Sequence, residues 1–125
     1  MIGHGCVYWN ELTTSDLSAA KAFYSDLFGW TYEEIRTPAG PYTLARVPGQ
    51  TRPVAGLIAW PSDQSGADQW FVYLAVADID AAVATAAAAG GSVAPIYDVP
   101  GVGRFATVVD PTGATCGMVQ RIRED

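Results

Sequence analysis

The sequence is short of positive charge and of long apolar runs, and each shortage excludes a class of protein. Lys and Arg together number 7 against 13 Asp and Glu, which gives a formal net charge of −6 at pH 7. Nucleic acids and anionic membranes are bound by basic patches, so we expect neither as a partner. No apolar run approaches the roughly 20 residues of a membrane-spanning helix, and the start MIGHG does not resemble a signal peptide. We therefore expect a cytoplasmic protein.

Cysteine and histidine are also scarce. The two cysteines, Cys6 and Cys116, stand at opposite ends of the chain, a spacing that matches neither a zinc site nor a disulfide framework. We expect both to be buried free thiols. The single histidine, His4, precedes the first predicted strand and is expected to belong to the N-terminal tail.

A strand, a helix cap, a helix and a helix stop follow one another within residues 6–30. Residues 7–13 alternate in polarity as a strand does, and Ser15 or Asp16 is placed to cap the helix that follows. That helix carries apolar residues at spacings of three and four, and Gly29 stands where a left-handed C-terminal cap is needed. This segment predicts one strand packed against one helix.

The same order of elements occurs twice along the chain. After the first helix we expect three short strands, at residues 30–35, 42–47 and 54–60, and then a polar linker at 61–69. The order then begins again with a strand at 70–77 and a helix at 79–89. Three more strands follow, at 92–99, 104–110 and 115–122. Placing Asp16 over Asp78 superposes caps, aromatic residues and glycine stops. The sequence predicts two βαβββ repeats, about 6–60 and 70–122, in one α+β domain of residues 1–125.

One helix covers only one face of each four-stranded sheet, so the sheet should curl around a cavity on its other face. The strand positions of Leu12 and Leu74 are expected to face the helices. The alternate positions carry Trp9 and Glu11 in the first repeat and Phe71 and Tyr73 in the second. A mixed aromatic and polar lining is typical of a ligand pocket.

Three motifs resemble a known family. They are D-x-x-x-A-x-x-F-Y beginning at Asp16, F-G-W beginning at Phe28, and G-R-F-x-x-x-x-D-P-x-G-A beginning at Gly103. Together they resemble the vicinal oxygen chelate superfamily, which includes glyoxalase I, extradiol dioxygenases and the fosfomycin- and bleomycin-resistance proteins. The resemblance covers residues 7–119 and is strongest to the glyoxalase-like branch. It implies a single pseudo-symmetric domain with a curled sheet.

The resemblance also shows where this chain departs from metal-dependent members of the family. Those members hold a divalent ion with a histidine in the first strand and a glutamate in the last strand of each repeat. The corresponding positions are Trp9, Phe71 and Gly117, and the fourth lies in residues 54–60, which contain no acid. Because none of these side chains ligates a metal, we expect no metal and no cofactor.

The candidate ligand-binding residues are those of the inward strand positions together with one further tryptophan, namely Trp9, Glu11, Phe71, Tyr73 and Trp60. Trp9 and Phe71 either hold a flat ligand by stacking or fill the space that the metal would occupy. Glu11 is the tentative catalytic residue, as a general acid or base. It could instead pair with Arg46 or Arg104, or be solvated at the cavity mouth. Tyr42 and Tyr97 are further candidates for the rim.

Two functions remain open at this stage. The first is a metal-free small-molecule-binding protein of the bleomycin-resistance type, which sequesters an aromatic natural product or drug and confers antibiotic resistance. The second is a metal-independent lyase or isomerase that uses Glu11. An interaction module would require a filled cavity, and fold alone does not choose among these. We also expect a homodimer, because the repeat leaves sheet edges exposed.

Overall fold

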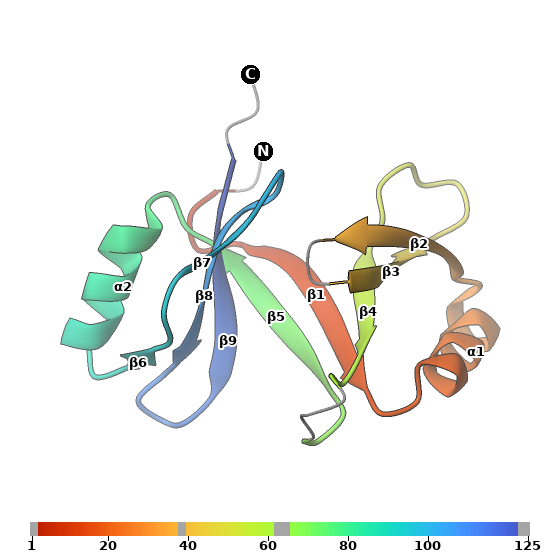
Figure 1. Ribbon diagram of the computed structural model, residues 1–125, viewed down its shortest axis with the longest axis horizontal. Helices are drawn as coiled ribbons and strands as arrows, with labels where there is room; N and C mark the ends of the chain where they lie inside the picture. Colours follow the sequence, from red (N-terminus) through yellow and green to blue (C-terminus); the bar gives the residue numbers. More distant parts are fainter. Residues whose placement is uncertain (1–2, 38–39, 62–65, 123–125) are drawn as a thin grey trace. The chain divides into compact units, whose positions relative to one another are not determined.

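The structure is a computed structural model that describes residues 3–37, 40–61 and 66–122. Its elements run β1 (Val7–Thr14), α1 (Leu17–Phe28), β2 (Thr31–Thr37), β3 (Gly40–Arg46), β4 (Ala55–Ala59), β5 (Gln69–Ala75), α2 (Ile79–Ala88), β6 (Ser92–Val93), β7 (Tyr97–Val99), β8 (Gly103–Val109) and β9 (Thr115–Arg121) (Figure 1). The α+β class and the repeated order of elements are confirmed. Neither helix in the described part of the chain is long and apolar enough to cross a membrane.

The strand predicted at 92–99 is divided into β6 and β7, which both pair with β8. Residues 94–96 separate them. Pro95 has no backbone N–H to give to a strand ladder, while the Ala94 N–H still donates to the Thr107 carbonyl at 2.9 Å. The interruption thus follows from the proline.

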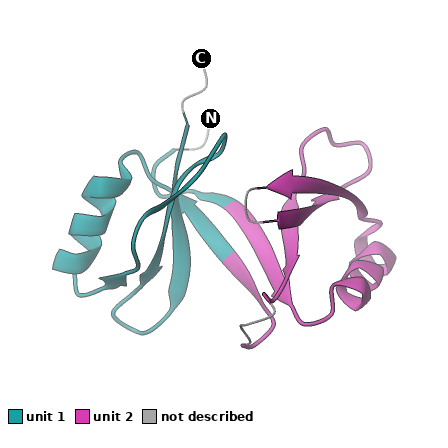
Figure 2. Cartoon of the chain, in the orientation of Figure 1, with its two compact units in different colours: residues 1–8, 72–125 teal, residues 9–71 magenta. Residues whose placement is uncertain are grey.

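The chain divides into two compact units (Figure 2). Unit 2, in magenta, is residues 9–71, and unit 1, in teal, is residues 1–8 together with 72–125. The start of the chain is held in unit 1, because His4 Nδ1 accepts a hydrogen bond from the Ala77 N–H at 3.0 Å and Gly5 N–H donates to the Ala75 carbonyl at 2.7 Å. His4 is therefore an anchoring residue and not a loose tail.

The cysteine prediction is correct in one respect and wrong in another. Both thiols are free, but Cys6 is exposed and Cys116 is half-buried. Cys6 begins the segment that leads into β1, at a position with little chain packed over it. Partial burial and the nearby Asp110 carboxylate raise the pKa of the Cys116 thiol.

Unit 2 is a four-stranded sheet in the order β2, β3, β4, β1, with β1 and β4 parallel and the other pairs antiparallel. Its core consists of the buried residues Leu12, Ala45, Ala55 and Leu57, against which α1 packs Leu17, Ala20 and Tyr24. Leu12 therefore faces the helix, as its strand phase predicts. Asp16 caps the helix by accepting from the Ala19 N–H at 3.0 Å, and Gly29 ends it at φ 72°.

Unit 1 follows the same plan. Its strands lie in the order β5, β9, β8, β6, with β7 also paired to β8. Its core joins Ile79 of α2 to Ala106 of β8 and Met118 of β9, and Leu74 lies opposite Met118 in the parallel β5–β9 register. Asp78 caps α2 by accepting from the Ala81 N–H at 3.2 Å.

Strand register shows the repeat most directly. In unit 2, Glu11 of the first strand lies opposite Gly56 of the last, and in unit 1 Tyr73 lies opposite Gly117. Both glycines are buried. Each repeat thus pairs its first and last strands in parallel and places a glycine beside the central side chain of the first strand.

Candidate functional site

The main candidate site is a hydrogen-bonded cluster of three side chains on β1 and β3, which we call the Trp9 cluster: Trp9, Glu11 and Tyr42. Because Leu12 faces α1, strand alternation places Trp9 and Glu11 on the opposite face of the sheet. The Tyr42 hydroxyl donates to Glu11 Oε1 at 2.7 Å and accepts from Trp9 Nε1 at 2.9 Å. All three side chains are partly buried.

Gly56 makes this arrangement possible. Tyr42 lies on β3 and Glu11 on β1, and β4 runs between these two strands. To reach Glu11, the phenol ring crosses β4 at Gly56, where a Cβ would overlap the Tyr42 hydroxyl. Any other residue at this position would push the ring away from the carboxylate.

Burial is the largest effect on the Tyr42 hydroxyl, and it raises the pKa well above the ordinary value. The adjacent Glu11 carboxylate raises it further, because a negative phenolate beside a carboxylate is repelled. The hydrogen bond donated by Trp9 lowers the pKa of Tyr42, but this effect is smaller than those of burial and of the Glu11 charge. Tyr42 is therefore a neutral hydrogen-bond donor at physiological pH.

The two arginines considered as partners of Glu11 make ion pairs elsewhere. Arg46 pairs with Glu33 on the neighbouring strand at 2.7 Å. Arg104 pairs with Asp80 on α2 at 2.8 Å and with Asp98 on β7 at 3.4 Å. Arg104 thus joins a helix and two strands of unit 1, which is a structural role.

Unit 1 carries an aromatic counterpart of the Trp9 cluster. Leu44 lies opposite Gly56, and Thr107 lies opposite Gly117. The residues two positions before them, Tyr42 and Phe105, are therefore equivalent in the two repeats. Phe105 meets Tyr73 edge to face with ring centroids 5.6 Å apart. The polar contact of one repeat therefore becomes an aromatic contact in the other.

Phe105 also stacks on Tyr97, with centroids 5.6 Å apart and ring planes at 14°. Tyr97 is 48% exposed and forms the outer side of this aromatic set. The sequence analysis overlooked Phe105, although it is the phenylalanine of the G-R-F motif. The alternation of side chains along the predicted strand 104–110, taken with its pairing to the strand at 115–122, was the signal that could have identified Phe105.

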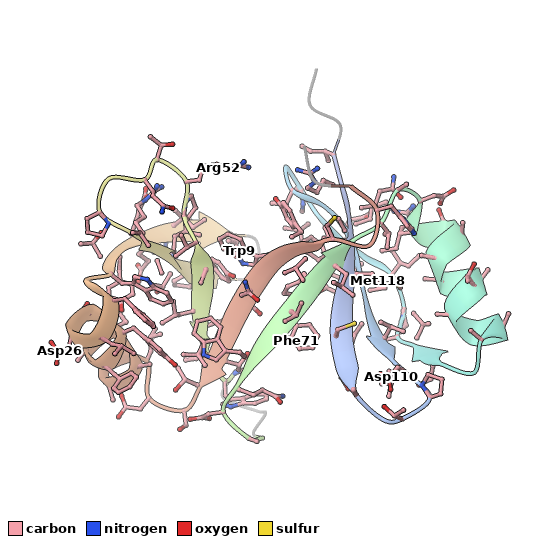
Figure 3. All side chains as sticks on the ribbon, turned by 180° about the vertical axis from the view of Figure 1, so that it is seen from behind. Trp9, Asp26, Arg52, Phe71, Asp110 and Met118 are labelled. Atoms are coloured by element: carbon pink, nitrogen blue, oxygen red, sulfur yellow. The ribbon has the colours of Figure 1, made fainter. Side chains whose placement is uncertain are left out.

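The remaining predicted site residues are Trp60, which follows β4, and Phe71 on β5. Trp60 Nε1 donates to Asp68 Oδ1 at 3.1 Å, and Ser15 donates its backbone N–H and hydroxyl to the same carboxylate at 3.0 and 2.7 Å. These donors, the Ser15 backbone N–H foremost, lower the pKa of Asp68. Trp60 is thus tied to the loop before β5. Phe71 is a half-buried residue of β5 (Figure 3).

The residues at the metal-binding positions that the resemblance implies do not fit a metal ion. Trp9 contributes an indole N–H that is already donated to Tyr42, Phe71 a phenyl ring, and Gly117 no side chain. Across residues 3–37, 40–61 and 66–122, no group of three His, Cys, Asp or Glu side chains is placed to hold one. No step that uses a metal is therefore derived for this chain.

Sequence comparison shows the family of the chain. Residues 4–116 match the Glyoxalase/Bleomycin resistance protein/Dioxygenase superfamily, and the chain belongs to that superfamily. It is 38% identical over 124 residues to "Putative glyoxylase CFP32" of Mycobacterium tuberculosis, covering 95% of this chain and 47% of the relative. It is 36% identical over 125 residues to anthracycline biosynthesis protein DnrV of Streptomyces peucetius, covering 88% and 45%. The chain thus spans about half the length of these relatives.

Solved structures agree on the fold. Methylmalonyl-CoA epimerase from Mycobacterium tuberculosis is similar with a TM-score of 0.68 and 18% identity, covering 98% of this chain and 93% of that one. An extradiol ring-cleaving dioxygenase from B. fuscum is similar with a TM-score of 0.67 and 19% identity, covering 96% and 33%. At this level of identity the likeness concerns the fold alone.

The Trp9 cluster predicts that the Tyr42 hydroxyl ionises at unusually high pH. The chain has 6 tyrosines, and Tyr42 should ionise only well above the ordinary value of a phenol, because it is buried beside the Glu11 carboxylate. Because its folded pKa lies above the ordinary 10.0, its contribution to stability is complete below pH 10 and falls as the pH rises further. Tyrosinate absorbance against pH measures this, and Tyr42→Phe should remove the step at high pH.

Tyr97→Phe is the matched control, because Tyr97 is 48% exposed, and this variant should keep the step that Tyr42→Phe removes. If Tyr42→Phe left that step in place, the burial and hydrogen bonding assigned to Tyr42 would be wrong.

Proposed function

We propose that this chain is a metal-free small-molecule-binding protein that binds a flat aromatic natural product or drug at the Trp9 cluster. The observation that carries the proposal is the hydrogen-bonded Trp9, Tyr42 and Glu11 set on the sheet face away from α1. It combines two aromatic surfaces with one carboxylate, which is the composition of a site that stacks a ring and orients it with a polar group.

The cluster is suited to binding because it is already ordered. Trp9 is fixed through its Nε1 and Tyr42 through its hydroxyl, so a ligand that stacks on these rings loses little further side-chain entropy on binding. The name of the relative DnrV, an anthracycline biosynthesis protein, supports a natural product as the ligand. The free cysteines and acidic composition support a cytoplasmic setting.

The alternative function is a metal-independent lyase or isomerase in which Glu11 acts as general acid or base. The 2.7 Å hydrogen bond from Tyr42 favours it, because a fixed donor would hold the carboxylate in position. The raised pKa of Tyr42 weighs against this function, since a phenol that resists ionisation is a poor relay for the transferred proton. We therefore place binding first.

The metal-free character has a direct test. Protein purified without added chelator should contain far less than one equivalent of zinc, iron, nickel or manganese per chain, because the ligand positions carry Trp9, Phe71 and Gly117. Elemental analysis measures the content. A stoichiometric ion that a chelator removes together with ligand binding would overturn the proposal.

The second test uses tryptophan fluorescence with an anthracycline as the probe. Binding should quench the emission of the wild-type protein, and Trp9→Phe should lose most of that quenching while the melting temperature changes by a few degrees at most. Trp70→Phe is the control, because Trp70 bonds to Tyr24 on the helix side of unit 2, and it should retain the quenching. Retention of the full response in Trp9→Phe would remove Trp9 from the site.

The third test separates the two functions through Glu11→Gln, which still accepts the Tyr42 hydrogen bond but carries no charge. A binding protein should change only in affinity, by about 1 to 3 kcal/mol where the charge meets the ligand. An enzyme should lose turnover by roughly 10²- to 10⁴-fold with affinity little changed. Titration calorimetry and turnover assays on the same preparations distinguish these results, and no change in either quantity would exclude Glu11 from the site.

A further inference from the structure

We propose that the Trp9 cluster selects aromatic ligands that carry hydrogen-bond donors, such as phenolic hydroxyl or amine groups, over ligands that carry carboxylates or other acceptors. This inference rests on the proposed function, because it concerns the ligand of the same site. It follows from the hydrogen bonds within the cluster, which use the N–H and O–H groups of its side chains. The polar capacity left for a ligand is that of an acceptor.

Both donors of the cluster are already engaged. An indole has one N–H, and that of Trp9 is donated to the Tyr42 hydroxyl at 2.9 Å. A phenol has one O–H, and that of Tyr42 is donated to Glu11 Oε1 at 2.7 Å. A ligand that takes either donor breaks one of these bonds and leaves a partly buried polar atom without its partner. Acceptor groups on a ligand are therefore disfavoured.

The Tyr42 hydroxyl keeps its proton and its partner near neutral pH. Burial, and then the Glu11 carboxylate, hold the pKa of Tyr42 above its ordinary value of 10.0. The absence of a side chain at Gly56 leaves the phenol ring room to lie across β4, where a Cβ would overlap its hydroxyl. Packing and electrostatics thus both commit the Tyr42 O–H to the carboxylate, so this donor is not offered to a ligand.

The acceptor capacity of the cluster comes from Glu11. A carboxylate donates nothing and accepts at about four lone-pair positions, and the Tyr42 hydroxyl takes one of them at Oε1. Even a further donor on this carboxylate would leave it able to accept from a ligand. Because the group is also negatively charged, a ligand hydroxyl or ammonium gains a charge-assisted hydrogen bond there, whereas a ligand carboxylate is repelled.

Two other polar side chains on this face of the unit 2 sheet do not reverse the balance. Arg46 lies on the face by strand alternation, but its guanidinium binds Glu33 at 2.7 Å and the Thr51 carbonyl at 2.9 Å. Thr13 lies further along β1 on the same face, and its hydroxyl both donates and accepts. The formal net charge of −6 adds to the repulsion of an anionic ligand.

Three naphthalene probes of similar size test the preference by equilibrium dialysis near neutral pH. 2-Naphthol carries a donor, 2-methoxynaphthalene lacks it, and 2-naphthoate carries an anionic acceptor. The wild-type protein should bind 2-naphthol roughly 10-fold more tightly than 2-methoxynaphthalene, which corresponds to about one hydrogen bond, and should bind 2-naphthoate most weakly. Equal affinities for the first two probes, or tightest binding of 2-naphthoate, would overturn the inference.

Glu11→Gln should increase the binding of an acceptor ligand. Its amide oxygen still accepts from Tyr42, while its nitrogen supplies donors that the wild-type cluster lacks. This variant should bind 2-naphthoate roughly 10-fold more tightly than the wild-type protein and lose most of the preference for 2-naphthol. Glu34→Gln is the matched control, because Glu34 is an exposed residue of β2 and the same charge is removed outside the cluster. A gain shared by both variants would assign the effect to net charge and contradict the inference.

The same measurements separate failure of this inference from failure of the proposed function. If an anthracycline quenches the emission of Trp9 while the naphthalene probes show no preference for a donor, the inference is wrong and the proposed function stands. If neither the anthracycline nor any naphthalene probe binds, both are wrong. The comparison of the three probes uses the wild-type protein alone, so its outcome does not depend on the folding of any variant.

Discussion

The close approach of the Tyr42 ring to the backbone of Gly56 determines the arrangement of side chains on the face of the unit 2 sheet away from α1. Without a side chain at Gly56 the phenol crosses β4 and bonds to Glu11. That bond then orients the carboxylate, and the hydroxyl in turn accepts from Trp9. A buried phenol with both of these contacts is expensive to disrupt, since each separated polar group would lose its partner.

Much of the fold follows from local rules in the sequence. Asp16 and Asp78 are helix caps because their carboxylates accept from the N–H groups three residues on, and Leu12 faces the helix because strand positions alternate. The division of the strand at 92–99 could also have been read from Pro95. Local rules do not give the partner of each strand. They therefore do not show which side chains meet between paired strands.

The candidate site also depends on strand pairing that local sequence rules do not give. Trp9 and Glu11 were placed together from their strand phase, and the structure brings them onto one hydroxyl. Tyr42 could not be assigned from the sequence, because its direction depends on the β3–β4 register and on the space above Gly56. The alternative that paired Glu11 with Arg46 could not be decided from the sequence for a similar reason: Arg46 meets Glu33 only because β2 and β3 pair in a particular register.

The glycine that faces the first strand of each repeat also has an evolutionary consequence. A mutation that adds even a methyl group at Gly56 changes the rotamers open to Tyr42, so positions 42 and 56 are not free to drift separately. In the other repeat the Phe105 ring of β8 meets the Tyr73 ring of β5 across β9, where Gly117 lies opposite Tyr73. The same geometry therefore ties an aromatic ring to a glycine in both repeats.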